Sequence, residues 1–334
     1  MRVLLETHPA FADHDAGPGH PERPERLDAV LEGVDRLDLG DDLVRVEPRP
    51  ATRDELVTVH GAGFVDALHE FCVGGGGRID PDTRADGRSW QAAVLAAGSA
   101  LDAVERLEKG EADAAFCAAR PPGHHAGPAK AMGFCLLNGI AVCASVLADR
   151  GEKVLIADWD AHHGNGTQDV FYSDPRVLYV SMHQSPLFPG SGRLEEIGEG
   201  DGEGTTVNFP VPPGATGDVY LAAFDRVVDA VATDFDPAWV LVSAGFDAHR
   251  SCPITSLGLS AGDYADLMRR SAALAPPGRC VAILEGGYDL DALRGGAEAA
   301  VGALVGLDRR PEPPTSGGPG MDVVEAAAEL RSSS

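Results

Sequence analysis

Lysine is almost absent from this 334-residue sequence, and the shortage of positive charge dominates its composition. Only Lys109, Lys130 and Lys153 occur, against 52 aspartates and glutamates spread along the whole chain, so the formal net charge is -25. Proteins that bind nucleic acids concentrate basic side chains on one surface, and this composition argues against such a partner. Self-repulsion of this size is typical of proteins that work at high salt. We interpret it as a halophilic adaptation, with an ordinary acidic cytosolic protein as the alternative.

Long hydrophobic runs are also missing. No apolar stretch reaches the ~20 residues that a membrane-spanning helix needs. The first residues, MRVLLETHPAF, lack the apolar core and the cleavage site of a secretory signal. We therefore expect a cytoplasmic protein that has no membrane partner.

No two cysteines have the CxxC spacing of a zinc ribbon or a redox motif. The six cysteines stand singly among apolar neighbours: Cys72, Cys117, Cys135, Cys143, Cys252 and Cys280. We expect them to be reduced and mostly buried, which excludes a disulfide framework and a cysteine-ligated zinc site.

What the chain does contain is a regular alternation of short apolar stretches with longer amphipathic ones. Strands are predicted at 2–5, 112–119, from 154, at 177–183, at 206–211, and within 239–247 and 280–288. Helices are predicted from 22, at 52–72 as two short ones, and at 88–108, 135–149, 218–235 and 260–275. The four glycines at 74–77 are expected to form a flexible loop. Alternating strands and helices favour an α/β fold with a mainly parallel sheet, covered on both faces.

The division of the chain follows from its composition. Residues 1–308 are expected to form one domain, because α/β domains often reach this length. RRPEPPTSGGPG, residues 309–320, is typical of a linker, and a short helix is expected after it, within 321–334.

The stretch VLIADWDAHHGNGT, residues 154–167, carries the strongest chemical signal. A buried strand leads directly into Asp158, Asp160, His162 and His163. Capping of a strand end needs one such residue, whereas two acids and two histidines within six positions indicate a ligand site. His163 is expected only to support the turn.

Polar clusters follow three other predicted strands. They contain His124 and His125, Asp247, and the run Glu285–Tyr288. All of them should meet at one edge of a parallel sheet. Asp160, His162 and Asp247 would then supply one nitrogen and two oxygens to zinc and leave a position open for water, whose pKa zinc lowers to ~7.

The remaining polar residues suit acid–base chemistry. Two adjacent histidines with different partners can hold different pKa values and so divide the roles of acid and base. Tyr288, after two glycines, could donate its hydroxyl to a developing oxyanion.

Eight motifs together resemble the zinc-dependent histone deacetylase family, with its acetoin-utilization and acetylpolyamine relatives. They are GHPERPERL (19–27), RPPGHHA (120–126), GFCLLN (133–138), DWDAHHGNGTQ (158–168), FPGSG (188–192), VNFPVPPGATGD (207–218), SAGFDAH (243–249) and LEGGYDL (284–290). They occur in the family's order over roughly residues 3–305. The resemblance implies a three-layer arginase/deacetylase-like fold with about eight strands.

The resemblance also implies roles for single residues. Zinc, or ferrous iron in its place, would bind Asp160, His162 and Asp247. His125 would be the general base and then acid, His124 paired with Asp158 the electrostatic partner, and Tyr288 the oxyanion donor. Phe134 and Phe188 would line a narrow tunnel, with room left by Gly133, Gly286 and Gly287. A monovalent cation, K⁺, would lie near Asp158, Asp160, His162 and the backbone of Ser181 and Met182.

One position separates branches of that family. The resemblance implies that the partner of His125 is residue 165, which is Asn here, as in class II and bacterial members, whereas class I members have Asp there. The presence of Tyr288 favours a working catalyst, since some weakly active class II members lack it.

Two other protein classes are alternatives to a deacetylase. Arginase-like ureohydrolases share the fold but need an acid where this chain has Gly164, which favours one metal over two. A non-catalytic acyl-lysine reader is disfavoured because His125 and Tyr288 are both present.

Substrate identity is the weakest inference from the sequence. The expected partner is an acetylated protein, with a small acetylated amine of the polyamine type as the alternative; an oligomer is left open. The segment Ala248–Ile254 contains no acid and one arginine, Arg250, which would repel a polyamine if it faced the tunnel. The alternative gate is the acidic loop 195–203, with Glu195, Glu196 and Asp201, or a partner subunit.

Overall fold

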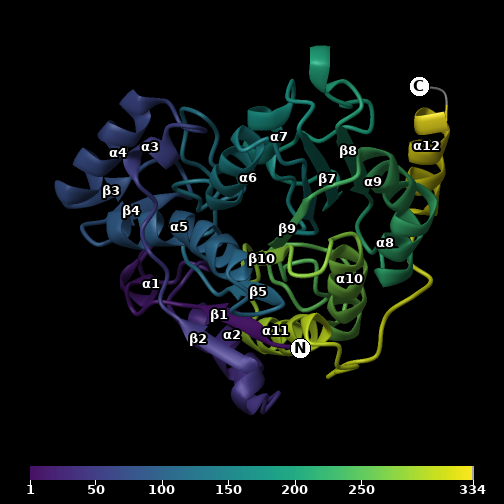
Figure 1. Ribbon diagram of the computed structural model, residues 1–334, viewed down its shortest axis with the longest axis horizontal. Helices are drawn as coiled ribbons and strands as arrows, with labels where there is room; N and C mark the ends of the chain where they lie inside the picture. Colours follow the sequence, from purple (N-terminus) through teal and green to yellow (C-terminus); the bar gives the residue numbers. More distant parts are fainter. Residues whose placement is uncertain (333–334) are drawn as a thin grey trace.

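The computed structural model describes residues 1–332. Over those residues, its centre is one sheet of eight strands, all parallel (Figure 1). In spatial order they are β2 (Leu43–Val46), β1 (Val3–Glu6), β5 (Ala114–Cys117), β10 (Cys280–Leu284), β9 (Trp239–Ala244), β6 (Val154–Asp158), β7 (Val177–Gln184) and β8 (Thr206–Val211). The predicted fold class is confirmed.

Both faces of this sheet are buried, and strand β6 shows how. Val154 and Ile156 enter the core on one side, and Leu155 and Ala157 enter the core on the other. A strand between two layers of helices is apolar at every position, because successive side chains point to opposite faces. This explains why the strands occur in the sequence as continuous apolar runs.

Helices form the two outer layers. One face carries α3 (Arg53–Leu56), α4 (Ala62–Val73), α5 (Ser89–Glu108), α6 (Gly139–Asp149) and α7 (Asn165–Phe171). The other carries α1 (Ala10–Asp13), α2 (Glu25–Asp35), α8 (Gly217–Ala223), the π-helical turn η3 (Phe224–Val228), α9 (Asp229–Phe235), α10 (Ala261–Ala273), α11 (Leu290–Leu304) and α12 (Met321–Ser332). Two 3-10 turns, η1 (Gly40–Asp42) and η2 (Gly200–Gly202), lie in loops.

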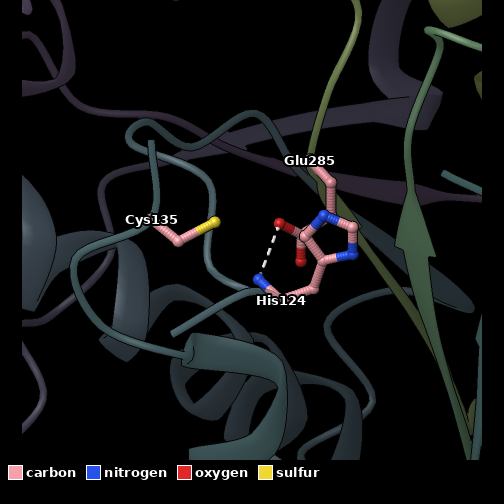
Figure 2. A group of neighbouring side chains, drawn as sticks. All are labelled: His124, Cys135 and Glu285. Carbon is pink, nitrogen blue, oxygen red and sulfur yellow. Dashed lines mark hydrogen bonds between the residues drawn. The ribbon is translucent and has the colours of Figure 1, made fainter. Parts of the chain in front are cut away.

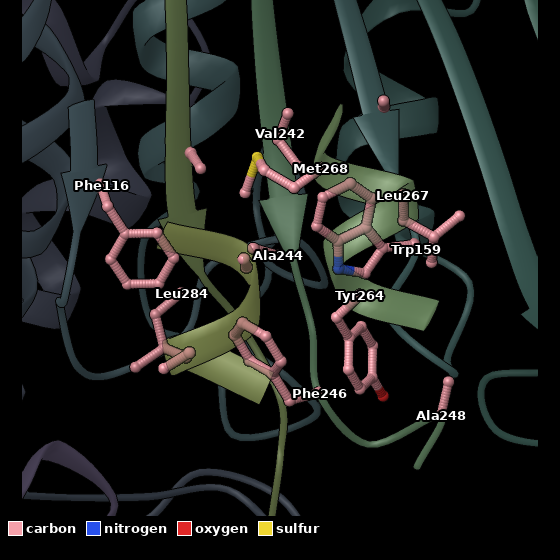
Figure 3. Close-up of a cluster of buried hydrophobic side chains, with 14 of the residues drawn as sticks. Phe116, Trp159, Val242, Ala244, Phe246, Ala248, Tyr264, Leu267, Met268 and Leu284 are labelled. Atoms are coloured by element: carbon pink, nitrogen blue, oxygen red, sulfur yellow. The ribbon is translucent and has the colours of Figure 1, made fainter. Parts of the chain in front are cut away.

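Packing on the second face fixes two residues of the candidate site. Trp159 and Phe246 follow β6 and β9 and are fully buried beside Tyr264 of α10 (Figure 3). The rings of Phe246 and Tyr264 meet edge to face, with centroids 5.0 Å apart. Since Trp159 and Phe246 directly precede Asp160 and Asp247, the core holds the backbone of both aspartates in place.

Several local predictions were wrong. The helix expected at 135–149 begins only at Gly139, because the side chain of Asn138 caps it by accepting a hydrogen bond from the amide of Ala141. The glycines at 74–77 do not form a free loop: β3 (Gly76–Arg78) pairs with β4 (Arg84–Asp86) in an antiparallel hairpin. Strand β2 and helices α7 and α11 were not predicted.

The end of the chain lies against the domain. Residues 309–320 contain no helix or strand, and α12 follows them as expected. The amide of Thr315 donates to Asp263 of α10 at 2.9 Å, and that of Gly318 donates to the hydroxyl of Thr216 at 2.8 Å. The segment is therefore tied to the second helical layer, while the division of the chain at residue 308 stays a prediction.

Within residues 1–332, no helix is long and apolar enough to cross a membrane.

Candidate active site

The predicted site residues follow the ends of four strands that are neighbours in the sheet. Strands β5, β10, β9 and β6 lie side by side and run parallel, so their carboxyl ends share one edge. Ligands of open α/β sheets bind at this edge. The turns that follow these strands bring the two histidines, the three aspartates and Tyr288 together.

Asp160, His162 and Asp247 converge on one point. Nδ1 of His162 lies 3.1 Å from Oδ1 of Asp160 and 2.9 Å from Oδ2 of Asp247. The other carboxylate oxygens accept backbone hydrogen bonds at 2.8 Å, Asp160 from Gly286 and Asp247 from Ala161. Each residue offers one ligand atom, and these atoms lie within 4.8 Å of one another. The set is one nitrogen and two oxygens, and its role as the metal site stays a prediction.

Electrostatics favour a cation at this point. All three side chains are buried. Burial by itself lowers the pKa of His162, but the carboxylates of Asp247 and Asp160 outweigh it and raise the pKa to about 10. Two buried carboxylates this close together need a positive charge, and a divalent metal supplies it while matching the donor atoms. The residues therefore fit zinc, and they fit ferrous iron as well.

A glycine is required beside these ligands. A Cβ atom on Gly286 would lie 2.4 Å from Oδ2 of Asp247 and 2.6 Å from Oδ2 of Asp160. Any side chain there would displace a carboxylate, so the backbone amide of Gly286 can reach Asp160 only because the residue is glycine.

His124 carries a buried carboxylate partner. Its Nδ1 lies 3.0 Å from Oδ2 of Asp158, which also accepts a hydrogen bond from the hydroxyl of Tyr179 at 3.0 Å. Burial lowers the pKa of His124, but the carboxylates of Asp158 and Asp160 outweigh it and raise the pKa to about 10. This imidazole is held in its cationic form.

His125 has the opposite environment. Its Nδ1 donates to the amide oxygen of Asn165 at 2.9 Å, which leaves Nε2 as the proton acceptor. Burial, with His124 and His162 nearby, holds the pKa of His125 well below its usual range. The two rings, with centroids 4.0 Å apart, therefore have pKa values that are pushed in opposite directions.

A cavity of about 250 Å³ connects these groups to the surface. It is lined by Asp82, His125, Gly133, Phe134, His162, Leu187, Phe188, Ile254 and Tyr288. The ring of Phe134 meets Tyr288 edge to face at 5.6 Å, and that of Phe188 meets His125 at 5.1 Å. A Cβ atom on Gly133 would lie 2.5 Å from the ring of His125, so only glycine lets this loop come so close. Burial holds the pKa of Tyr288 well above its usual range, and its hydroxyl stays protonated.

Comparison with known proteins identifies this arrangement. Residues 20–304 match the family model of the histone deacetylase domain. The chain belongs to the histone deacetylase family. The resemblance predicted from the motifs is thereby confirmed, and this membership supports a deacetylase that hydrolyses an acetylated substrate.

Individual members of the histone deacetylase family align over most of the chain. A probable deacetylase of Archaeoglobus fulgidus is 42% identical over 316 residues, which cover 91% of this chain and 88% of that protein. Histone deacetylase 10, chloroplastic, of Oryza sativa subsp. japonica is 34% identical over 331 residues, covering 91% of this chain and 73% of that protein. The crystal structure of the HDA15 HD domain is similar with a TM-score of 0.90 at 35% identity, covering 99% of this chain and 94% of that chain.

The sequence analysis missed the residues that hold the deacetylase site together. Arg26, fully buried, donates to the carbonyls of Glu285 and Gly287, so it clamps the turn that carries Tyr288. Its guanidinium also lies 4.9 Å from the centroid of the Tyr288 ring. Glu22 binds both Arg26 and Arg120, and this network joins the motifs GHPERPERL and RPPGHHA, which lie about 100 residues apart in the sequence.

Glu285 belongs to a second group with metal-ligand chemistry, together with His124 and Cys135 (Figure 2). Its carboxylate accepts backbone hydrogen bonds from Gly123 at 2.7 Å and His124 at 3.1 Å, and one from the hydroxyl of Ser243 at 3.2 Å. The ring of His124 is occupied by Asp158. The Glu285 carboxylate therefore fixes the histidine turn to the end of β10.

His163 joins the turn that carries the proposed metal ligands to the loop after β7. Its ring lies 2.8 Å from the hydroxyl of Ser191 and 2.9 Å from the side-chain oxygen of Gln168. The ring of His183 lies beside that of His163, with centroids 4.7 Å apart, and its Nε2 donates to the carbonyl of Gly192 at 3.0 Å. Both histidines thus fasten the loop that carries Phe188.

The expected monovalent-cation residues come from the ends of β6 and β7. Strand pairing places Asp158 opposite Ser181, with Met182 next along β7. The K⁺ site itself stays a prediction.

The structure also revises what surrounds the tunnel mouth. Asp82, in the β3–β4 hairpin, lines the cavity and was not predicted, because it approaches through a long-range contact. Arg250, expected at the mouth if it faced the tunnel, is not among the lining residues and pairs with Glu312. His249 binds the same glutamate.

Proposed function

We propose that this protein is a lysine deacetylase, which hydrolyses the acetyl amide of acetyl-lysine in proteins and uses zinc held by Asp160, His162 and Asp247. The observation that carries the proposal is a cavity with two phenylalanine walls that ends between His125, His162 and Tyr288. Aromatic walls suit the apolar stem of lysine, and the polar floor suits its acetyl amide.

The chemistry divides among these groups. Zinc bound there would polarise the acetyl carbonyl and lower the pKa of water to ~7. Neutral His125 takes the proton of the attacking water on Nε2 while Asn165 holds Nδ1. Tyr288 donates its hydroxyl to the developing oxyanion.

The second half of the reaction returns that proton. When the C–N bond of the amide breaks, His125 transfers the proton to the leaving lysine amine, and acetate remains. His124, kept cationic by Asp158, contributes positive charge beside the negative charge that develops in the transition state.

Protein acetyl-lysine is favoured over acetylpolyamines by the apolar rim. Leu187, Phe188 and Ile254 line the cavity, and apolar side chains do not select a second amine. Asp82 is the one carboxylate in that lining within residues 1–332. The charge argument based on Arg250 does not support this preference, since Arg250 is paired with Glu312. Of the acidic-loop candidates, Glu196 holds Gln168 and the amide of Gly192.

A direct comparison of substrates tests the proposal. We expect a higher kcat/KM on acetyl-lysine peptides than on acetylspermidine or acetylputrescine, measured with zinc at equal salt. A tenfold preference for the polyamines would replace this substrate with the small amine and would make Asp82 and Glu195 the residues to mutate. Ferrous iron in place of zinc in the same assay identifies the more effective metal.

A further inference from the structure

Most arginines of this acidic protein are neutralised by ion pairs. On the outer surface, for example, Arg176 pairs with Asp174 and Asp149, and Arg226 pairs with Glu325. Two exceptions donate to backbone carbonyls: Arg2 to that of Glu111, just before β5, and Arg331 to that of Gly204, just before β8. These are at the edge of the sheet opposite the site.

Four exposed arginines have no carboxylate partner within residues 1–332: Arg23, Arg78, Arg84 and Arg193. All four line cavities that border the tunnel mouth. Arg23 lines a cavity of about 530 Å³ that shares Tyr288 with the tunnel. Arg193 lines one of about 340 Å³ that shares Leu187 and Phe188 with it. These guanidinium groups lie around the opening together with the carboxylates of Asp15, Glu25, Asp82 and Glu195, which line the same three cavities.

The other two arginines share one groove, between residues 16–21 and the β3–β4 hairpin. It has a volume of about 340 Å³, and no carboxylate residue is among those that line it within the described chain. The guanidinium of Arg84 lies 3.8 Å from where a Cβ atom on Gly17 would stand, and it makes no hydrogen bond. Arg78 donates to the carbonyls of Asp80 and Pro81 and keeps its charge unpaired.

This groove shares a wall with the tunnel. His20 lines the groove, packs edge-on against Phe134 at 4.6 Å, and donates from Nε2 to the carbonyl of Asp82 at 3.0 Å. Asp82 lines the tunnel, and its neighbour Pro81 lines the groove. A peptide with its acetyl-lysine in the tunnel would place adjacent residues over the groove.

The acids near the groove accept hydrogen bonds within their own turns, and Asp82 accepts one from the hydroxyl of Thr83 at 3.2 Å. Oδ1 of Asp80 accepts from the amides of Asp82 and Thr83, and Oδ1 of Asp15 accepts from the amide of Gly17. They hold the turns in shape without contacting either guanidinium. The unpaired N–H groups of Arg78 and Arg84 are therefore free to bind a carboxylate from outside.

We infer that Arg78 and Arg84 bind acidic side chains next to the acetyl-lysine, so that the enzyme prefers acetyl-lysine in an acidic segment of protein. This inference rests on the proposed deacetylase function and narrows its substrate class. A basic, histone-like segment is disfavoured by the same charges.

Matched peptides test it. Three acetyl-lysine peptides of equal length carry two Glu, two Gln or two Arg on each side of the acetyl-lysine. For the parent we expect kcat/KM to be about three- to tenfold higher with Glu than with Gln, chiefly through KM, since two exposed ion pairs contribute about this much. The salt is the lowest at which the parent stays folded, because screening weakens such pairs.

The variants decide whether the groove is responsible. In Arg78→Gln/Arg84→Gln the Glu-to-Gln ratio should fall to about one, and Arg78→Lys/Arg84→Lys should restore part of it. Arg176→Gln/Arg226→Gln, which changes net charge equally, should keep the parent ratio. Peptide binding followed by fluorescence anisotropy gives the same ratios without turnover.

Two failures are distinguishable. No turnover of any peptide would contradict the proposed function, and anisotropy would still report the charge preference. Turnover or binding with no preference for Glu, or a preference that survives in the Arg78→Gln/Arg84→Gln variant, would overturn the assignment of the groove.

Discussion

At the scale of single residues, burial and neighbouring charges set the protonation state of each titratable side chain of the site. His124 and His125 are adjacent in sequence, yet Asp158 keeps one cationic and burial beside Asn165 keeps the other neutral. The sequence named all four residues because they lie in short motifs. It could not name Arg26 as the clamp on the Tyr288 turn, because that contact joins residues 261 positions apart.

The metal ligands give the first prediction. Asp160→Ala or Asp247→Ala should lose bound zinc and nearly all hydrolysis, because each removes one of three protein ligands. Zinc content after dialysis, measured by atomic emission, checks it. Asp234→Ala, an exposed aspartate of α9, serves as the control and should retain metal. Stoichiometric zinc in both ligand variants would contradict the ligand set.

The proposed oxyanion donor, Tyr288, gives the second prediction. Tyr288→Phe should keep its fold and its zinc but lose on the order of 10²–10³ in kcat, which is the usual effect of removing one oxyanion donor. Steady-state kinetics on an acetyl-lysine peptide, with metal content measured in parallel, separate this loss from loss of the ion. If Tyr288→Phe turned over the peptide as fast as the parent, Tyr288 would line the tunnel without donating to the oxyanion.

At the scale of helices and strands, the sequence predicted the elements whose burial gives a clear apolar pattern. It missed elements that are stabilised mainly by contacts with distant parts of the chain. Fully buried strands such as β6 and β9 appear as apolar runs. Strand β2 was missed because it is a half-exposed edge strand of four residues. Helix α11 was missed because alanine and glycine dominate it, which suits close packing against α2 but leaves few large apolar side chains to mark its buried face.

The packing of β1 under α5 leads to a prediction about pH. Glu6, at the end of β1, is fully buried beside Asp102 of α5. Burial, and then the charge of Asp102, raise the pKa of Glu6 to about 9. The folded protein therefore keeps a proton there that the unfolded chain releases above its usual pKa of 4.5. The stability that this proton provides is complete below pH 4.5 and is lost as the pH rises towards 9.

The variant Glu6→Gln should not show this loss of folding stability at high pH, because glutamine has no proton to release. Relative to the parent, the variant should be more stable by about 2–4 kcal/mol near pH 8 and equally stable near pH 4. Thermal or urea unfolding across this pH range measures the difference. A difference that does not change with pH would show that Glu6 is already ionised in the folded protein.

At the scale of the whole molecule, the net charge of -25 is the dominant feature. Ion pairs neutralise most arginines, but nearly half of the acidic side chains have no basic residue to balance them. Mutual repulsion destabilises the compact state, and salt screens it. The melting temperature should therefore rise between ~0.1 M and ~2 M KCl.

A neutral osmolyte gives the control for that prediction. Sucrose at matched osmolality stabilises by exclusion from the surface and does not screen charge. KCl should raise the melting temperature more than sucrose does. If KCl and sucrose raised the melting temperature equally, or if KCl had no effect, the halophilic interpretation would be wrong. The protein would then be an ordinary acidic protein.

The measurement that tests the central claim most directly is acetate release from a purified acetyl-lysine peptide by the zinc-loaded protein. We expect one acetate and one free lysine amine per peptide, with activity lost on chelation, restored by zinc, and absent from His125→Ala at unchanged zinc content. Hydrolysis that persists in His125→Ala, or no acetate release by a folded, zinc-loaded parent, would contradict it.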